Sequence, residues 1–275
     1  MPLFICTTCG TQYPPSDVPP ATCPICEDAR QFVPLTGQAW TTLERMGLTH
    51  VNAFRCYEPG LVGIGTFPHF AIGQRALLLR TPAGNVLWDC ISLLDDATVE
   101  IVKALGGLAA IAISHPHFYT TMVEWAHAFG APVWLHEADQ ARVMRPDAGI
   151  RFWEAETHEL LPGVTLIHAG GHFPGATVLH WKDGAGGRGA LLSADIAQVA
   201  RDRKSVSFLW SYPNMVPLSA SAVERIAGRL ARFSFDAVYG IFWDLVIPKG
   251  GSGIVARSAE RYIQAITGEG LAGTP

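Results

Sequence analysis

One short segment, residues 112–120 with the sequence AISHPHFYT, constrains this chain more than any other. The apolar run Leu108 to Ile113 predicts a buried strand, and His115 and His117 follow it with one residue between them. On an extended chain this spacing turns both side chains to the same side. Two imidazoles at the end of a buried strand can supply the first two ligands of a metal ion. The alternative is that one histidine caps the strand and the other lies at the surface.

The composition limits the kinds of function. The chain has 275 residues, of which 49% are hydrophobic and 16% charged, and its formal net charge is -4. This length suits a large domain with a small appendage, and the weak negative charge does not favour binding to nucleic acid or to an anionic membrane. No apolar run approaches the roughly 18 residues of a spanning helix, and the start of the chain does not resemble a signal peptide. We therefore expect a cytoplasmic protein whose partner is a small-molecule substrate.

Two CxxC pairs near the start of the chain, Cys6 with Cys9 and Cys23 with Cys26, predict a second metal centre. Four thiolates at this spacing suit a tetrahedral Zn²⁺, and Gly10 permits the tight turn after the first pair. The segment has too few apolar residues to form its own core, so a structural zinc explains how it folds. The pairs resemble a zinc ribbon. They also resemble the knuckles of rubredoxin, whose insert is much longer, so an electron-transferring iron centre is the alternative.

The order of strand-like and helix-like segments indicates the fold class. We expect a zinc ribbon over residues 1–35, a linker with a short helix over 36–58, and the main domain over 59–275. In the main domain, strands are predicted at 76–80, 85–89, 108–113, 131–136, 164–169, 176–181, 190–193 and 237–242, and helices at 98–105, 121–129, 137–145, 219–233 and 256–266. Residues 184–189, with four glycines, predict a hairpin loop. Alternating strands and helices predict an α/β fold with helices outside a sheet.

Two later motifs complete the predicted metal site. His172 lies in the glycine-rich loop GGHFPG between two predicted strands, and Asp195 comes just after the apolar strand at 190–193. Both are at the end of a buried strand, as the first two histidines are. Three imidazoles and one carboxylate form a sufficient ligand set for Zn²⁺ or Fe²⁺.

The chain resembles the metallo-β-lactamase superfamily from about residue 53 onward. The resemblance rests on the motifs NVLWD (85–89), SHPH (114–117), GGHFPG (170–175) and SADI (193–196), in that order. It implies an αβ/βα sandwich of two mixed sheets flanked by helices, with the metal at the edge between the sheets. It also implies that His115, His117 and His172 hold the metal, that Asp195 joins it, and that Asp89 supports the ligands. Family members often pair, so a homodimer is one expectation.

The departures from the family pattern predict one metal rather than two. The family motif usually continues with an aspartate and a histidine, where this chain has Tyr119 and Thr120. The last family histidine has no counterpart in residues 238–243, VYGIFW. Three ligands of the second metal are therefore missing together. Some members use a single iron held by two histidines and an aspartate, so the identity of the metal, Zn²⁺ or Fe²⁺, stays open.

A single metal still supports hydrolysis, because it lowers the pKa of a bound water to about 7. The aspartate that usually handles the proton is absent, and Tyr119 occupies its place, so Asp195 and Tyr119 are the predicted catalytic residues. A tyrosine with the usual pKa of about 10 is suited to donate a hydrogen bond or to act as a general acid. Further candidates for the pocket are His69, Glu124, Arg201, Arg203, Tyr212 and Asp244. Either arginine could bind an anionic substrate. The alternative for each of these six residues is an ordinary position on the solvent-exposed surface.

These features predict a metal-dependent hydrolase that acts on an ester, thioester, amide or phosphoester. Two other functions fit the same residues. The first is a mononuclear iron oxygenase or other redox enzyme, supplied with electrons by the four-cysteine centre. The second is a binding protein without catalysis, in which the metal only maintains the shape of the site.

Overall fold

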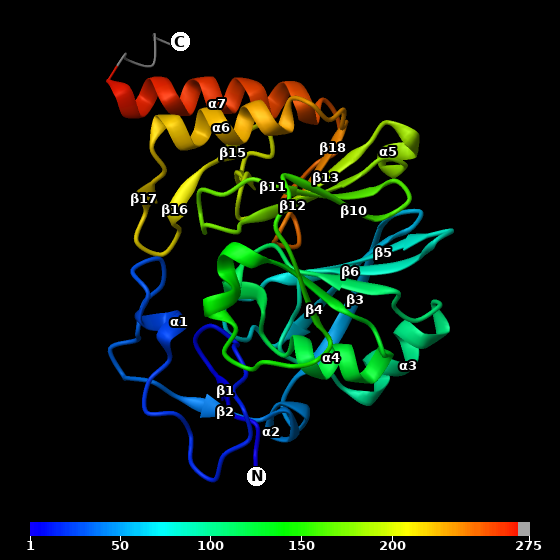
Figure 1. Ribbon diagram of the computed structural model, residues 1–275, viewed down its shortest axis with the longest axis vertical. Coiled ribbons are helices and arrows are strands. Elements are labelled where there is room, and N and C mark those ends of the chain that lie inside the picture. Colours follow the sequence, from blue (N-terminus) through cyan, green and yellow to red (C-terminus); the bar gives the residue numbers. More distant parts are fainter. Residues whose placement is uncertain (269–275) are drawn as a thin grey trace. The chain divides into compact units, whose positions relative to one another are not determined.

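A computed structural model describes residues 1–268, and they contain two mixed β-sheets that each carry helices (Figure 1). Contacts within the chain divide it into two units, Met1–Glu154 and Ala155–Pro275, and each unit contains one of the sheets. The predicted α/β class, with two mixed sheets flanked by helices and an N-terminal cysteine cluster, is confirmed.

The sheet of the first unit has seven strands in the order β3-β4-β5-β6-β7-β8-β9. Its strands are β3 Val51–Glu58, β4 Leu61–Phe67, β5 Arg75–Thr81, β6 Gly84–Trp88, β7 Ala110–Ala112, β8 Val133–His136 and β9 Ile150–Trp153. Neighbours are antiparallel from β3 to β6 and parallel from β6 to β9. The predicted hairpin is β5 with β6, and every residue of β7 is buried, as expected for a central parallel strand.

The first unit also contains short helices. They are α1 Pro24–Glu27, α2 Leu43–Gly47, α3 Asp96–Ala104 and α4 Met122–Phe129, with the 3₁₀ helices η1 Pro116–Phe118 and η2 Glu137–Arg142. The Asp95 side chain caps α3 by accepting a hydrogen bond from Thr98 N at 2.8 Å, and Gly130 ends α4 in the left-handed conformation. The prediction of a helix over 137–145 was wrong in type and length. Pro146 disfavours helical backbone at the preceding residue, and only a 3₁₀ helix forms.

The sheet of the second unit has six strands in the order β10-β11-β12-β13-β18-β19. Its strands are β10 Thr157–Leu161, β11 Val164–His168, β12 Thr177–Trp181, β13 Ala190–Ala194, β18 Ala237–Gly240 and β19 Val246–Ile247. The pair β13-β18 is parallel and all other neighbours are antiparallel. The predicted hairpin loop joins β12 to β13 through the short segment α5 Gly184–Gly187, in which Ala185 and Gly186 have left-handed backbone rather than that of a regular helix. Two small ribbons follow: β14 Gln198–Val199 with β15 Val206–Ser207, and β16 Leu209–Ser211 with β17 Val216–Pro217.

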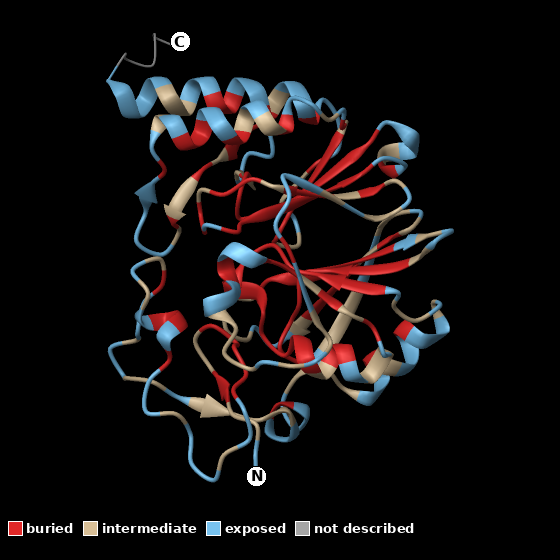
Figure 2. Ribbon diagram, viewed as in Figure 1, coloured by how far each residue is buried: buried red, intermediate tan, exposed pale blue. Residues whose placement is uncertain are grey.

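Two long helices, α6 Ala220–Leu230 and α7 Gly251–Thr267, lie side by side in the second unit (Figure 1). The side chain of Ser219 caps α6 by accepting a hydrogen bond from Ala222 N at 3.3 Å. Val223, Ile226 and Leu230 form the buried stripe of α6 (Figure 2), and burial of each contributes about 1.5–3 kcal/mol.

The main sheet begins earlier than the sequence predicted. Residues 36–58, predicted as a linker, contain β2 Trp40–Thr41, the expected short helix α2, and β3. β3 is the edge strand of the seven-stranded sheet and pairs with β4, so this sheet starts at Val51 rather than at residue 59. None of the eight residues of β3 is buried, so the strand lacks the apolar alternation that reveals a half-buried strand.

The N-terminal segment is built around a two-stranded pairing of β1 Ile5–Cys6 with β2. The four cysteines and Tyr13 form one small buried cluster, against which Trp40 packs. Within residues 1–268, helices are all too short or too polar to cross a membrane.

Candidate metal sites and a pocket in the second unit

The four cysteines of the N-terminal segment form a compact cluster of sulfur atoms. The Sγ atoms of Cys6 and Cys26 lie 3.6 Å apart, as do those of Cys9 and Cys23, and all four lie within 4.8 Å of one another. These separations are too long for disulfides, whose sulfurs are about 2.05 Å apart. Four sulfurs at about 2.3 Å from a tetrahedral Zn²⁺ lie roughly 3.8 Å from each other. The cluster therefore fits a metal ion with four cysteine ligands, as in a zinc ribbon.

The backbone holds the two cysteine pairs in tight turns. Gly10 N donates to Cys6 O at 2.9 Å and Cys26 N donates to Cys23 O at the same distance. Gly10 has a φ of +82°, which confirms the predicted need for glycine after the first pair. The hydroxyl of Tyr13 donates a hydrogen bond to Cys23 Sγ at 3.0 Å. Hydrogen bonds from the neighbouring thiols lower the pKa of Cys6 and of Cys23.

The N-terminal segment also contacts the loops next to the first two histidines. Ser92 Oγ donates to Gly10 O at 3.1 Å, and Gln12 N donates to Thr120 O at 3.1 Å. Thr121, the next residue, fixes the same loops because its hydroxyl lies within hydrogen-bond distance of the carbonyls of Ile91 and Ser92. The four-cysteine segment is thus attached directly to the end of the segment 112–120.

The first two histidines lie at the start of a 3₁₀ helix. His115 is extended, with φ -169° and ψ 169°, but Pro116 begins η1 and His117 lies inside it. The prediction that both histidines project from extended chain was therefore wrong, because proline favours the first position of a helix. The two rings are nevertheless close, with centroids 5.2 Å apart and possible ligand atoms within 4.8 Å. Both side chains are buried.

Asp89, at the end of β6, anchors the segment that carries these histidines. Its Oδ1 accepts a hydrogen bond from Ser114 N at 2.8 Å, and Ser114 Oγ lies 2.9 Å from His115 Nδ1. Burial raises the pKa of Asp89 to about 7, although the hydrogen bond from Ser114 opposes the shift. The resemblance implied a supporting role for Asp89, and this hydrogen bond shows how the residue holds the loop.

His172 and Asp195 form a second buried pair, in the second unit. His172 Nδ1 lies 3.1 Å from Leu209 O. Because a carbonyl only accepts, Nδ1 carries the proton and the lone pair is on Nε2, as in a histidine prepared to bind a metal. Asp195 follows β13 directly, and its backbone carbonyl accepts a hydrogen bond from Tyr212 OH at 2.7 Å. Possible ligand atoms of His172 and Asp195 lie within 4.8 Å of each other.

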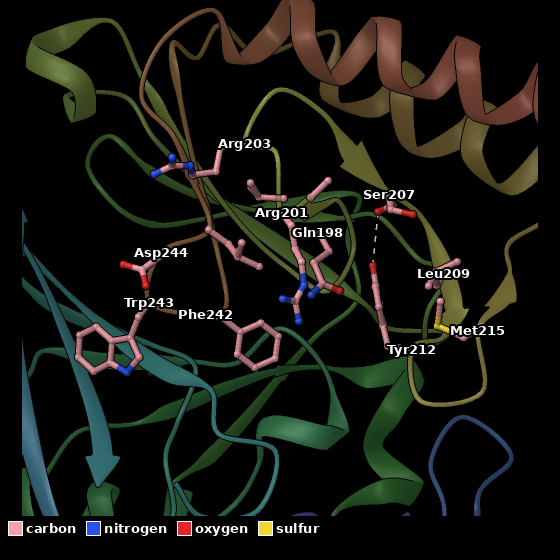
Figure 3. Close-up of a pocket in the computed structure, with 13 residues that line it drawn as sticks. Gln198, Arg201, Arg203, Ser207, Leu209, Tyr212, Met215, Phe242, Trp243 and Asp244 are labelled. Atoms are coloured by element: carbon pink, nitrogen blue, oxygen red, sulfur yellow. Dashed lines mark hydrogen bonds between the residues drawn. The ribbon is translucent and has the colours of Figure 1, made fainter. Parts of the chain in front are cut away.

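A pocket of about 850 Å³ lies in the second unit, formed by the segments 198–203, 207–215 and 242–245 (Figure 3). Four of the six predicted pocket residues line it: Arg201, Arg203, Tyr212 and Asp244. The rest of its wall includes apolar and aromatic side chains, among them Leu209 and Phe242. Burial and the nearby charge of Asp195 raise the pKa of Tyr212 well above its usual value, so its hydroxyl stays a donor.

The other two predicted pocket residues belong to the first unit and do not line this pocket. His69 is exposed and lies against Gly73 in the loop before β5. Glu124 forms an ion pair with Arg145 at 2.5 Å, and Arg145 also donates a hydrogen bond to the side chain of Gln12. Glu124 therefore helps to attach the N-terminal segment to α4.

Tyr119, the predicted proton donor, is buried in the first unit. Burial, together with the negative charge of Asp139, raises its pKa well above the usual value. The hydroxyl thus keeps its proton at neutral pH, which agrees with a donor rather than a base.

Sequence reasoning missed several contacts around these sites. The carbonyl of Leu209 and the Ser114 amide act through the backbone, which leaves no sequence signal. Gln198 and Phe242 line the pocket, but only the fold brings their segments together.

Comparison with known proteins gives a curated relative and a shared fold. No protein-family model matches the chain. The uncharacterized protein YmaE of Bacillus subtilis (strain 168) is 48% identical over 271 residues, which cover 98% of each chain. Among solved structures, VMB-1 matches with a TM-score of 0.59 and 10% identity over 78% of this chain and 98% of that chain. The mono-zinc form of the metallo-β-lactamase FIM-1 from Pseudomonas aeruginosa matches with a TM-score of 0.56 and 13% identity over 76% and 95%. These structures confirm the metallo-β-lactamase fold.

Proposed function

This chain belongs to the family of Bacillus subtilis YmaE and has the metallo-β-lactamase fold, and from this premise we propose that it is a metal-dependent hydrolase. The proposed substrates are small-molecule esters, thioesters, amides or phosphoesters. The observation that carries the proposal is the presence of two buried pairs of possible metal ligands, in each of which one histidine is held by a hydrogen bond, His115 by Ser114 and His172 by the carbonyl of Leu209. The proposed location is the cytoplasm.

The proposed ligands of one metal are His115, His117, His172 and Asp195. Each pair alone offers two donors, whereas catalytic zinc sites use three protein ligands and an open position. The pairs must therefore act together to hold a catalytic ion. Tyr119 and Thr120 replace two ligands of a second metal, and FIM-1 shows that a protein of this fold has a mono-zinc form. Imidazole and carboxylate ligands suit either Zn²⁺ or Fe²⁺.

The proposed chemistry divides between the metal and the protein. When bound, the metal supplies Lewis acidity and makes hydroxide available at neutral pH. The carbonyl of Leu209 holds His172 in the tautomer whose Nε2 binds metal, and Asp89 and Ser114 fix the backbone before His115. Tyr119 keeps its proton, so its role is to donate a hydrogen bond or a proton. Asp195 supplies the carboxylate of the site.

The four-cysteine cluster is proposed to hold a structural Zn²⁺. Its four sulfurs are buried, so the site has no open position for a substrate. Purified protein should contain zinc at this site and show no visible absorbance. Iron there, with a strong visible absorption band, would favour the redox alternative over a simple hydrolase.

A substrate panel tests the hydrolase. Chromogenic esters, thioesters, amides and phosphoesters are offered to the metal-loaded protein, with the metal content measured in the same sample. We expect turnover of at least one class, lost in His172→Ala together with one equivalent of metal. His127→Ala is the control, because His127 forms a surface ion pair with Asp147. Full metal content without turnover of any substrate would favour the binding-protein alternative, and light scattering of the same sample tests the expected homodimer.

A further inference from the structure

The pocket of the second unit combines positive charge with aromatic walls. Its lining includes two arginines and one acidic residue, Asp244, together with Phe242 and Trp243. Its volume of about 850 Å³ suits a small organic molecule, since ligand pockets measure about 300–1,000 Å³. An arginine is always charged at neutral pH, so the pocket carries fixed positive charge.

The two arginines differ in direction. Figure 3 shows the Arg201 side chain extending toward Gln198 and the space between Phe242 and Tyr212, whereas the guanidinium of Arg203 is turned away from these residues. Within residues 1–268, Arg201 makes no ion pair. Its planar guanidinium can therefore bind a carboxylate or a phosphate through two parallel hydrogen bonds.

The pocket shares residues with the surroundings of His172 and Asp195. Tyr212 lines it and donates to the backbone carbonyl of Asp195 at 2.7 Å, and its ring centroid lies 5.6 Å from that of His172. Leu209 also lines the pocket, and its carbonyl accepts the hydrogen bond from His172 Nδ1. A molecule bound in the pocket therefore lies beside two of the proposed metal ligands.

We infer that this pocket binds the anionic part of the substrate, and that Arg201 selects small molecules with a carboxylate or phosphate group on an apolar or aromatic body. The inference rests on the proposed function, because it assigns a substrate class to that hydrolase. Phe242 and Trp243 contact the apolar body, and Arg201 pairs with the anionic group. Arg203 contributes to the general positive charge without direct contact.

The test compares matched substrates on the metal-loaded protein. Two 4-nitrophenyl esters of equal chain length are used, the neutral butyrate and the anionic hemisuccinate. We expect the wild type to have a lower KM for the hemisuccinate, and Arg201→Gln to raise that KM about 10- to 100-fold, the usual value of a charge-assisted hydrogen bond. The KM for butyrate should change little. Arg203→Gln is the matched control, and its KM for the hemisuccinate should change less than about 3-fold, as expected for a charge without direct contact.

A binding measurement separates this inference from the proposed function. Calorimetry with 2-naphthoate and with 2-naphthyl phosphate, on the wild type and on His172→Ala, reports binding without turnover and shows which anionic group is preferred. If no substrate is hydrolysed but a naphthyl anion binds and Arg201→Gln abolishes the binding, the pocket assignment stands and the hydrolase proposal fails. If Arg201→Gln affects both esters equally, or neither naphthyl anion depends on Arg201, the assignment is wrong.

Discussion

Substitution of Gly10 by alanine tests how the four-cysteine segment is joined to the rest of the first unit. Gly10 has a φ of +82°, and a Cβ added there would lie 2.3 Å from Ser92 Oγ and 3.4 Å from Thr120 Cγ2. The left-handed backbone costs roughly 1–2 kcal/mol for alanine. Insertion of a methyl group into a packed contact costs about 1–3 kcal/mol more. We expect Gly10→Ala to lower the free energy of unfolding by roughly 2–5 kcal/mol.

Gly37 provides the matched control, because it shares the backbone conformation without the contact. Its φ is +86°, and no atom lies within 4 Å of its added Cβ. Gly37→Ala should therefore cost only the roughly 1–2 kcal/mol of the left-handed backbone. Ser92→Ala alone removes the hydrogen bond to Gly10 O and should cost about 1 kcal/mol. In the double variant Gly10→Ala/Ser92→Ala the closest contact is gone, so the cost should be less than the sum of the single costs.

Denaturant unfolding and zinc release measure this effect. Each variant is unfolded in urea, and the release of zinc to a chromogenic chelator is followed under native conditions. Gly10→Ala should release zinc faster than Gly37→Ala, because Gly10 follows a metal-binding cysteine directly. Equal losses in the two glycine variants, or a double variant at least as unstable as the sum of the single changes, would refute the steric argument.

Three further predictions concern the loops and the pH dependence. Asp89→Ala removes the acceptor of Ser114 N and should lower the affinity for the active-site metal about 10- to 100-fold, measured by competition with a chelator, whereas Asp89→Asn keeps an acceptor oxygen and should lower it less. Burial lowers the pKa of His180 below its usual 6.5, although the hydrogen bond to Ser234 O has the opposite effect. The imidazole therefore binds a proton more tightly in the unfolded state than in the folded state. Stability should therefore fall as the pH drops below about 6.5, and His180→Gln should reduce that slope in urea midpoints between about pH 7 and 5. Cys23→Ser should remove zinc from the four-cysteine cluster and expose the N-terminal segment to protease, and unchanged zinc content would contradict this.

The sequence located the ends of buried strands well, and this is why the candidate ligands could be named in advance. His172 and Asp195 follow β11 and β13, whose buried residues are mostly apolar: Val164, Leu166 and Ile167 in β11, and Ala190, Leu191, Leu192 and Ala194 in β13. Such clusters of apolar residues are visible in a sequence because a strand inside the sheet must bury them. By contrast, β3 pairs along its whole length without a buried residue, so its backbone hydrogen bonds stabilise a strand that its side chains do not reveal. The turn at Pro116 was not predicted. The spacing of His115 and His117 was interpreted as extended chain, although the proline between them favours the start of a helix.

Thr120 lies at a position where the family pattern differs from this chain, and it contacts the N-terminal segment. In the family pattern this position is a histidine that binds the second metal, whereas here the Thr120 carbonyl accepts a hydrogen bond from Gln12 N. Thr120 is buried and has a φ of +37°, a strained conformation for a β-branched residue that surrounding contacts must maintain. A Cβ added at Gly10 would lie 3.4 Å from Thr120 Cγ2, so the side chain of Thr120 also faces the four-cysteine segment. The four-cysteine segment thus packs against the position at which the family pattern has a second-metal histidine, and this contact supports the proposed site for a single metal.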